Sequence, residues 1–190
     1  MSKINFNLKF GSVANLSRKM RTALKLEMDE YFDGAVRAFI DGVLDDTSSA
    51  QKGDGKIETG MSMASLLPLA MKVNYENEVR QEIHQGRRLN FKKGLTTLRG
   101  EWRKDRERSI FEGISAGENA FVFKKNYNSG TMKFSFKIMV FQHKHWEEKK
   151  ESLVKGREAM LEYMDTHKSE LTQNLGRVYR RITGSYFRGN

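Results

Sequence analysis

The sequence predicts an α+β fold in which a small antiparallel sheet, built on a central β-hairpin, packs against two long helices. Two kinds of spacing predict it. Apolar residues recur at every second position around residues 132–140, which is the period of a half-buried strand. On both sides of this region they recur at every third or fourth position, which is the period of an amphipathic helix. We expect one domain over residues 12–190, preceded by an arm or edge strand over residues 1–11.

The predicted hairpin extends over residues 120–142. Lys133 and Lys137 fall on one face of its second strand, and small polar residues at 128–130 supply a tight turn. The opposite face carries Met132, Phe134, Phe136, Ile138 and Val140. Two strands alone are barely stable in water, so we expect the long helices to cover this apolar face.

The first residues of the chain also alternate. Four apolar residues are separated by polar ones and followed by Gly11: Ile4, Phe6, Leu8 and Phe10. This pattern predicts a strand. Two alternatives stay open, an edge strand of its own domain and an arm that adds to the sheet of a neighbouring subunit.

The first long helix is expected from Ser12, a suitable N-cap, to about Leu44. Gly34 within it indicates a bend or a close crossing. At 1.5 Å per residue the helix would be roughly 45 Å long, which exceeds the width of a small domain, so we expect part of it to contact something else. Its apolar stripe consists of Leu16, Met20, Leu24, Met28, Tyr31, Ala35, Phe39 and Val43.

The second helical region follows Trp146 and ends at Gly184. It is either one helix of about 35 residues or two helices joined near residues 165–167. Gly156 leaves room for a close neighbour, which we expect to be the hairpin. The apolar stripe of this region consists of Leu153, Met160, Met164, Leu171, Leu175, Val178 and Ile182.

Between the first helix and the hairpin, a polar loop is expected over residues 45–60, and a short helix after it, capped by Thr59 or Ser62. Pro68 should end or kink that helix. Its core side is expected to consist of Met61, Ala64 and Leu67. Residues 74–117 read as a basic and partly helical excursion from the domain.

Composition and motifs point away from catalysis. The chain has no Cys, no Ser in a Gly-x-Ser-x-Gly turn and no complete phosphate loop, and the pair His143 and His145 lacks a third metal ligand. We therefore expect no enzyme, no cofactor and no metal site. No stretch approaches the roughly 20 apolar residues that span a bilayer, and no signal peptide is expected.

The formal net charge of +10 fits a nucleic-acid partner, an acidic protein partner or a solvated surface. The basic stretch 80–108 interleaves Phe91 and Trp102 with cations, but Glu101 and Glu107 interrupt it. A small basic nucleic-acid-binding protein using residues 80–108 is therefore an alternative function. Its candidate anion-contacting residues are Arg87, Arg88, Lys92, Lys93, Arg99 and Arg103.

The order of the predicted helices, loop and strands resembles that of a known group of proteins. A long helix and a polar loop precede Thr59-Gly60-Met61-Ser62-Met63-Ala64-Ser65-Leu66, a two-strand unit continues into an aromatic-led helix (Phe141 to Trp146, then Leu153 to Met164), and a basic helix ends the chain. This order resembles the head–tail connector proteins of tailed bacteriophages, namely the neck or tail-completion proteins and their minor-capsid relatives.

The resemblance implies a non-enzymatic virion protein that forms a homo-oligomeric ring at the head–tail junction. Its implied neighbours are a portal or head-completion protein and a tail-tube or tail-terminator protein, and a non-specific contact with packaged DNA is a further expectation. Such a protein is made in the host cytoplasm and has no catalytic residues. In such a ring, the candidate subunit-interface residues are Ile4, Phe6, Leu8, Phe10, Lys133 and Lys137.

Overall fold

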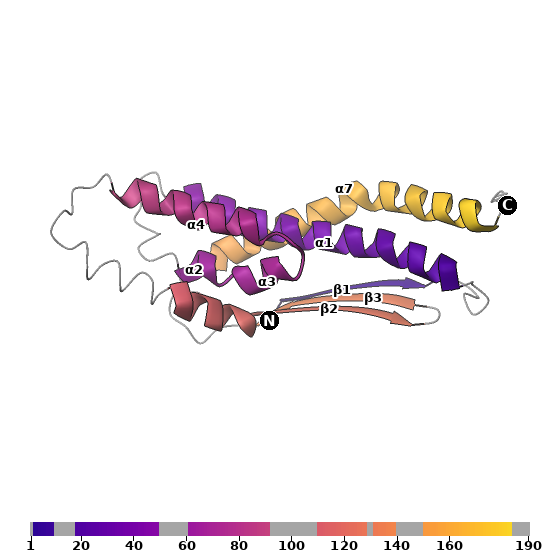
Figure 1. Cartoon of the computed structure of the whole chain (residues 1–190), viewed down its shortest axis with the longest axis horizontal. Helices are drawn as coiled ribbons and strands as arrows, with labels where there is room; N and C mark the ends of the chain where they lie inside the picture. Colours follow the sequence, from indigo (N-terminus) through magenta and orange to yellow (C-terminus); the bar gives the residue numbers. More distant parts are fainter. Residues whose placement is uncertain are drawn as a thin grey trace.

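Helices dominate the fold, and one small sheet lies beside them (Figure 1). The computed structural model describes residues 2–9, 18–49, 61–91, 110–128, 131–139 and 150–183. In chain order the elements are β1 (Ser2–Lys9), α1 (Arg18–Ser49), α2 (Met61–Ala64), α3 (Leu67–Met71), α4 (Glu76–Phe91), a helical stretch over 110–118, β2 (Phe121–Asn128), β3 (Thr131–Ile138) and α7 (Lys150–Thr183). The predicted α+β class is confirmed.

The sheet has three strands in the order β1-β3-β2, and both pairs of neighbours are antiparallel. β2 and β3 form the predicted hairpin, in which Phe121 pairs with Ile138. β1 pairs with β3 of its own chain, so it is an edge strand of its own sheet, as one of the two alternatives had it. Residues 129 and 130 of the expected turn lie outside the described residues.

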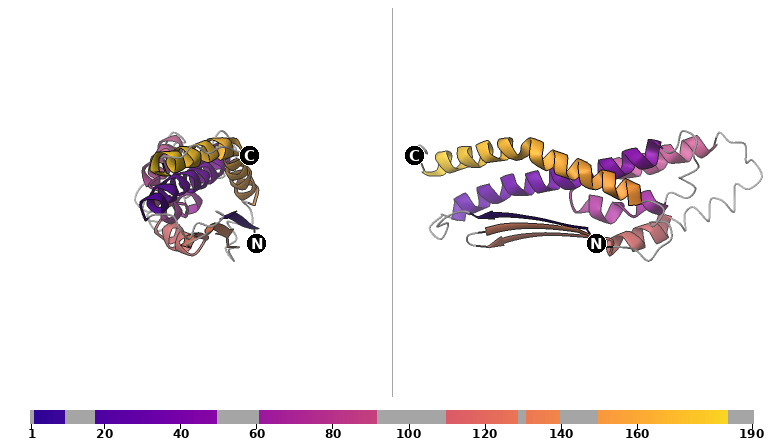
Figure 2. Two further views of the ribbon diagram at one scale, coloured as in Figure 1. Left: turned by 90° about the vertical axis from the view of Figure 1, so that its right-hand side faces the viewer. Right: turned by 180° about the vertical axis from the view of Figure 1, so that it is seen from behind.

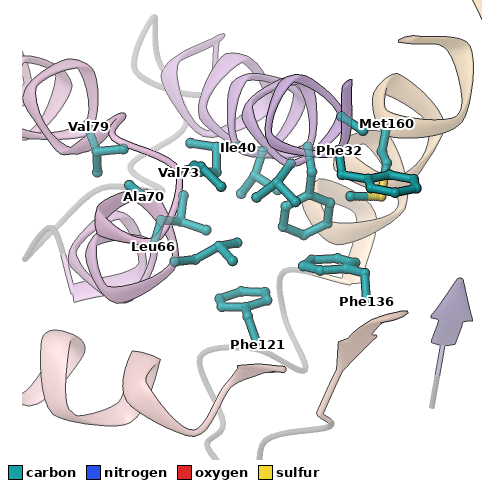
Figure 3. Packing of buried hydrophobic residues seen from close by; sticks show 14 of the residues in the cluster. Phe32, Ile40, Leu66, Ala70, Val73, Val79, Phe121, Phe136 and Met160 are labelled. Atoms are coloured by element: carbon teal, nitrogen blue, oxygen red, sulfur yellow. The ribbon is translucent and has the colours of Figure 1, made fainter. Parts of the chain in front are cut away.

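One face of the sheet packs against α1. Phe134, Phe136 and Ile138 are buried, whereas Lys137 is exposed, which confirms the predicted faces for these residues. The Phe32 ring of α1 stacks on Phe134 at a centroid distance of 4.4 Å. Figure 3 shows Phe121 and Phe136 directed from the strands toward the side chains of α1. Aromatic rings stacked at such a centroid distance attract each other in addition to the gain from burying their apolar surface.

α1 is the central layer, because neighbouring residues on it contact opposite sides. Tyr31 donates a hydrogen bond to the Met164 carbonyl of α7 at 2.6 Å, while Phe32 stacks on the sheet. The described residues of the predicted stripe, Met20 to Val43, are all buried. A second row is buried as well, and it consists of Phe32, Val36, Ile40 and Leu44. The layers are therefore sheet, α1 and α7 (Figures 1 and 2).

α7 is one helix of 34 residues, which settles the choice between one helix and two. It runs antiparallel to α1, and small residues let the two backbones approach. A Cβ atom added at Gly42 would lie 2.9 Å from the Gly156 Cα, and one added at Gly156 would lie 2.7 Å from the Phe39 carbonyl oxygen. A Cβ atom at Gly34 would collide with the Tyr163 ring, so the predicted close crossing is confirmed. The prediction for Gly156 was wrong about the neighbour, which is α1 and not the hairpin.

The short helices cover the other end of α1. The helical run that begins at Met61 is interrupted at residues 65 and 66, just before Pro68, which confirms the predicted break. Pro68 itself lies in the first turn of the next helix, α3. Proline is tolerated there because the first turn has no partner for its missing N–H. Ala64 and Leu67 are buried as expected. The Arg37 guanidinium of α1 donates two hydrogen bonds to the Val73 carbonyl, which fixes the turn after α3 to α1.

The excursion over residues 74–117 is partly helical, as predicted, because α4 and the stretch 110–118 are helices. Asn74 begins it with a φ of 52°, a left-handed conformation that Asn tolerates better than most residues. Other expectations fall outside what the structure describes. They concern Ser12, Leu16 and Thr59, the Met61 and Ser62 side chains, Val140, Trp146, Gly184 and residues 92–109.

Candidate functional site

The strongest polar cluster lies between α1 and β2. The Lys125 ammonium is 3.0 Å from Asp29 Oδ1 and 2.6 Å from Asp33 Oδ1, and the Tyr127 hydroxyl donates a hydrogen bond to Asp29. Alternation along β2 places Lys125 on the face of Phe121 and Phe123, toward α1. The two carboxylates stand four residues apart, so they share one side of the helix and reach the same lysine.

The electrostatics of this cluster are those of a structural clamp. Burial raises the pKa of the Asp33 carboxyl, and the hydrogen bond and charge of Lys125 oppose that rise. Asp33 Oδ1 is buried, and the Lys125 ammonium is its ion-pair partner. Burial, and then the hydrogen bond to Asp29, raise the pKa of Tyr127 above its ordinary value, so this hydroxyl remains a donor. The charges face one another and hold β2 on α1.

A cleft of about 240 Å³ opens between α1 and α4. The Tyr75 hydroxyl donates to Asp41 Oδ1 at 2.8 Å on its wall. Burial, and then the hydrogen bond to Asp41, raise the pKa of Tyr75 to about 12. The cleft is lined by Asp41, Leu44, Asp45, Tyr75, Glu78, Gln81 and Glu82. The carboxylates on this wall repel phosphate groups, so the cleft is not an anion-binding site.

In the described part of the chain, the buried polar side chains are Ser65 and Ser152. The His167 ring stacks on Tyr163, and its Nδ1 lies 2.9 Å from the Tyr163 carbonyl oxygen one turn earlier. Across the described ranges, no group of three or more His, Cys, Asp or Glu side chains is arranged to hold a metal ion. The pair His143 and His145 lies outside those ranges.

The predicted interface residues fall in the sheet. In register, Ile4 pairs with Phe136, Phe6 with Phe134 and Leu8 with Met132. Residues opposite each other in an antiparallel pair share a face of the sheet, so these positions of β1 belong to the face that packs on α1. Lys133 and Lys137 belong to the other face, and Phe10 lies outside the described residues. Their role in subunit contacts stays a prediction.

The predicted anion-contacting residues are not brought together by any described geometry. Arg87 and Arg88 belong to α4, where the structure describes the backbone at these two positions and not the side chains. Lys92, Lys93, Arg99 and Arg103 lie outside the described residues. Use of this stretch in nucleic-acid binding also stays a prediction.

Sequence reasoning missed the clamp of Lys125, Asp29 and Asp33. The sequence contained a signal for it. Lys125 stands two residues after Phe123 and four after Phe121, so it falls on the same, apolar face of the strand. A lysine on a buried face needs a carboxylate partner. Nothing in the sequence tells which of the 24 acidic residues supplies it.

Comparison of the chain with known protein families, characterised proteins and solved structures finds no match. Among the helices that the structure describes, none combines the length and the apolar character needed to cross a membrane.

Proposed function

We propose that the chain is a non-enzymatic structural subunit that assembles into a ring at the head–tail junction of a tailed-bacteriophage virion. In that ring it would stand between a portal or head-completion protein and a tail-tube or tail-terminator protein. The proposal combines the resemblance in the order of the parts with one observation on the structure, the outward side of α7.

α7 is the outermost layer, and α1 is the described element along which it packs (Figure 2). Two large aliphatic residues nevertheless lie on its outward side. Val154 is 52 % exposed and Leu161 is 44 % exposed, and they stand seven residues apart, which is two helical turns. The outward side of a surface helix is normally polar. An apolar pair at this spacing supports a seam for a helix of another subunit.

The sheet offers a second contact that would suit a ring. β1 and β2 are its two edges, and both run antiparallel to β3, so they run parallel to each other. If β1 of one subunit joined β2 of the next in a continuous sheet, the two strands would be parallel and the contact heterologous. Contacts of this kind close into rings when the rotation permits. Pairing of two β1 strands across a two-fold axis would be antiparallel and would give only a dimer.

The test is the oligomeric state of the purified full chain, measured by light scattering and negative-stain microscopy. We expect rings, or oligomers that form as the concentration rises. The variant Val154→Gln/Leu161→Gln should dissociate them, because each substitution removes apolar area from the seam and keeps good helix propensity. A wild-type chain that stays monomeric and does not co-purify with virus particles would contradict the proposal.

The matched control is Leu26→Gln/Met71→Gln, which removes two other exposed apolar side chains (64 % and 59 %) from α1 and α3. We expect this control to assemble like the wild type. Equal dissociation of both variants would show that the outward side of α7 is not the seam. Circular dichroism should show unchanged folding of both variants, since all four side chains are exposed.

A further inference from the structure

The strand register brings lysines from three separate segments onto one surface. We call the face of the sheet opposite α1 the outer sheet face. Its twelve positions include five lysines and no acidic residue. They are Lys3, Asn5, Asn7 and Lys9 on β1, Val122, Lys124, Asn126 and Asn128 on β2, and Thr131, Lys133, Ser135 and Lys137 on β3.

This face is open at the positions whose side chains the structure describes. Lys124, Asn126 and Lys137 are exposed, and Val122 and Ser135 are half-buried. α1 and α7 lie on the other side of the sheet, and the helical stretch over 110–118 lies beyond its end (Figures 1 and 2). The register also sets Lys3 directly opposite Lys137. Like charges at opposite positions destabilise a sheet, and a bound anion relieves that repulsion.

Lysines on the two faces of the sheet have different surroundings. Lys125, on the inner face, lies within 3.0 Å of two carboxylates of α1. The next residue on the strand in each direction, Lys124 and Asn126, belongs to a face with no carboxylate at any position. Positive charge on the inner face is therefore neutralised at Lys125, whereas the strand positions of the outer face supply no carboxylate for its lysines.

We propose that the outer sheet face binds the phosphate backbone of double-stranded nucleic acid without reading its sequence. Lysine, asparagine, serine and threonine are side chains that donate to phosphate oxygens. The face carries no aromatic residue, and single-strand binding relies on aromatic side chains for base stacking. Its one apolar position is Val122, too little for a bilayer or for the apolar anchors of a protein partner.

The dimensions suit a duplex. An eight-residue strand is about 27 Å long at 3.4 Å per residue. Over that length a duplex carries roughly 16 phosphates. The face has five lysine positions, fewer than the phosphates that a duplex carries over this length. This surface is separate from the basic stretch 80–108, and the inference does not depend on ring assembly.

The test measures binding of the full chain to a random-sequence DNA duplex by fluorescence anisotropy at several salt concentrations. Five phosphate contacts predict a slope of about −4.5 for log K against log salt concentration. Lys124→Gln/Lys137→Gln should reduce the size of that slope by about 2 and weaken binding roughly 10- to 100-fold at low salt. The matched control is Lys72→Gln/Lys168→Gln, which removes the same charge from exposed positions outside the sheet.

Equal losses in the two double variants would overturn the proposal, since net charge alone would then explain the binding. Tighter binding of an oligo(dT) single strand than of the duplex would also overturn it. So would binding of poly-glutamate or of phosphatidylserine vesicles that matches binding of the duplex. Light scattering on the same samples keeps this test apart from the proposed assembly. A chain that stays monomeric, does not co-purify with virus particles and binds duplex DNA through Lys124 and Lys137 supports this inference and contradicts the ring.

Discussion

The contact between α1 and α7 gives a prediction that can be measured within one helix. Gly156 and Gly176 both belong to α7, but a Cβ atom at Gly156 would lie 2.7 Å from the Phe39 carbonyl oxygen, whereas one at Gly176 would meet nothing within 4 Å. Alanine replaces glycine in a helix interior with a gain of about 1 kcal/mol. Gly176→Ala should therefore stabilise the fold by about that amount. Gly156→Ala makes the same gain in propensity and loses about 1–3 kcal/mol to overpacking.

The quantity to measure is the difference in unfolding free energy between these two variants, because helix propensity is common to both. Urea denaturation followed by circular dichroism should place Gly156→Ala below Gly176→Ala by about 1–3 kcal/mol. In a chain of this size each kcal/mol corresponds to roughly 2–4 °C in Tm. The reasoning is refuted if Gly156→Ala is as stable as Gly176→Ala, since the helices would then not approach at Gly156.

Two further predictions concern the charged groups of α1. Lys125→Met should lower the unfolding free energy by about 2–3 kcal/mol, because it leaves two carboxylates without their cation. This is less than the loss for a fully buried pair, since the two carboxylates are only partly buried. Lys124→Met, its exposed neighbour, should change it by no more than about 0.5 kcal/mol, and equal effects of the two in urea melts would rule out the clamp. Burial raises the pKa of Asp41, so the folded state binds that proton more readily than the unfolded state, and the contribution of Asp41 to stability falls as pH rises through the folded pKa. Asp41→Asn removes this titration, so its Tm should increase relative to that of the wild type as pH rises from about 4. A Tm difference that does not change with pH would contradict the assignment.

Spacing along the sequence was enough to predict the hairpin and the existence of both helices, because Phe134, Phe136 and the stripe from Met20 to Val43 follow the period of their element. The expected end of the first helix near Leu44 was wrong, since α1 continues to Ser49 through residues expected to be a polar loop. Spacing tells which side of an element is buried and not what buries it. That is why Gly156 was paired with the wrong neighbour. It is also why the second buried row, beginning with Phe32, was missed, since only a helix between two layers buries both rows.

The candidate surfaces were harder to predict. Lys133 and Lys137 were recognised as one face of a strand, but Lys3 and Lys124 join them only through the pairing of β1 and β2 with β3. Sequence distance hides such a surface, because its members come from segments more than 100 residues apart. Pro68 shows a different limit. A proline near the end of one apolar run is compatible with a helix that ends there and with one that begins there.

The position of β1 in the sheet has a consequence for synthesis. Lys9 pairs with Thr131, which lies 122 positions further along the chain. At roughly 5–20 residues per second, a ribosome takes about 6–24 s to reach β3 after completing β1. During that interval β1 has no strand to pair with, while neighbouring ribosomes on the same messenger carry the same strand. Because the paired strands β1 and β3 are so far apart along the sequence, the sheet is completed late and slowly during folding. The interval is therefore when β1 can exchange between copies.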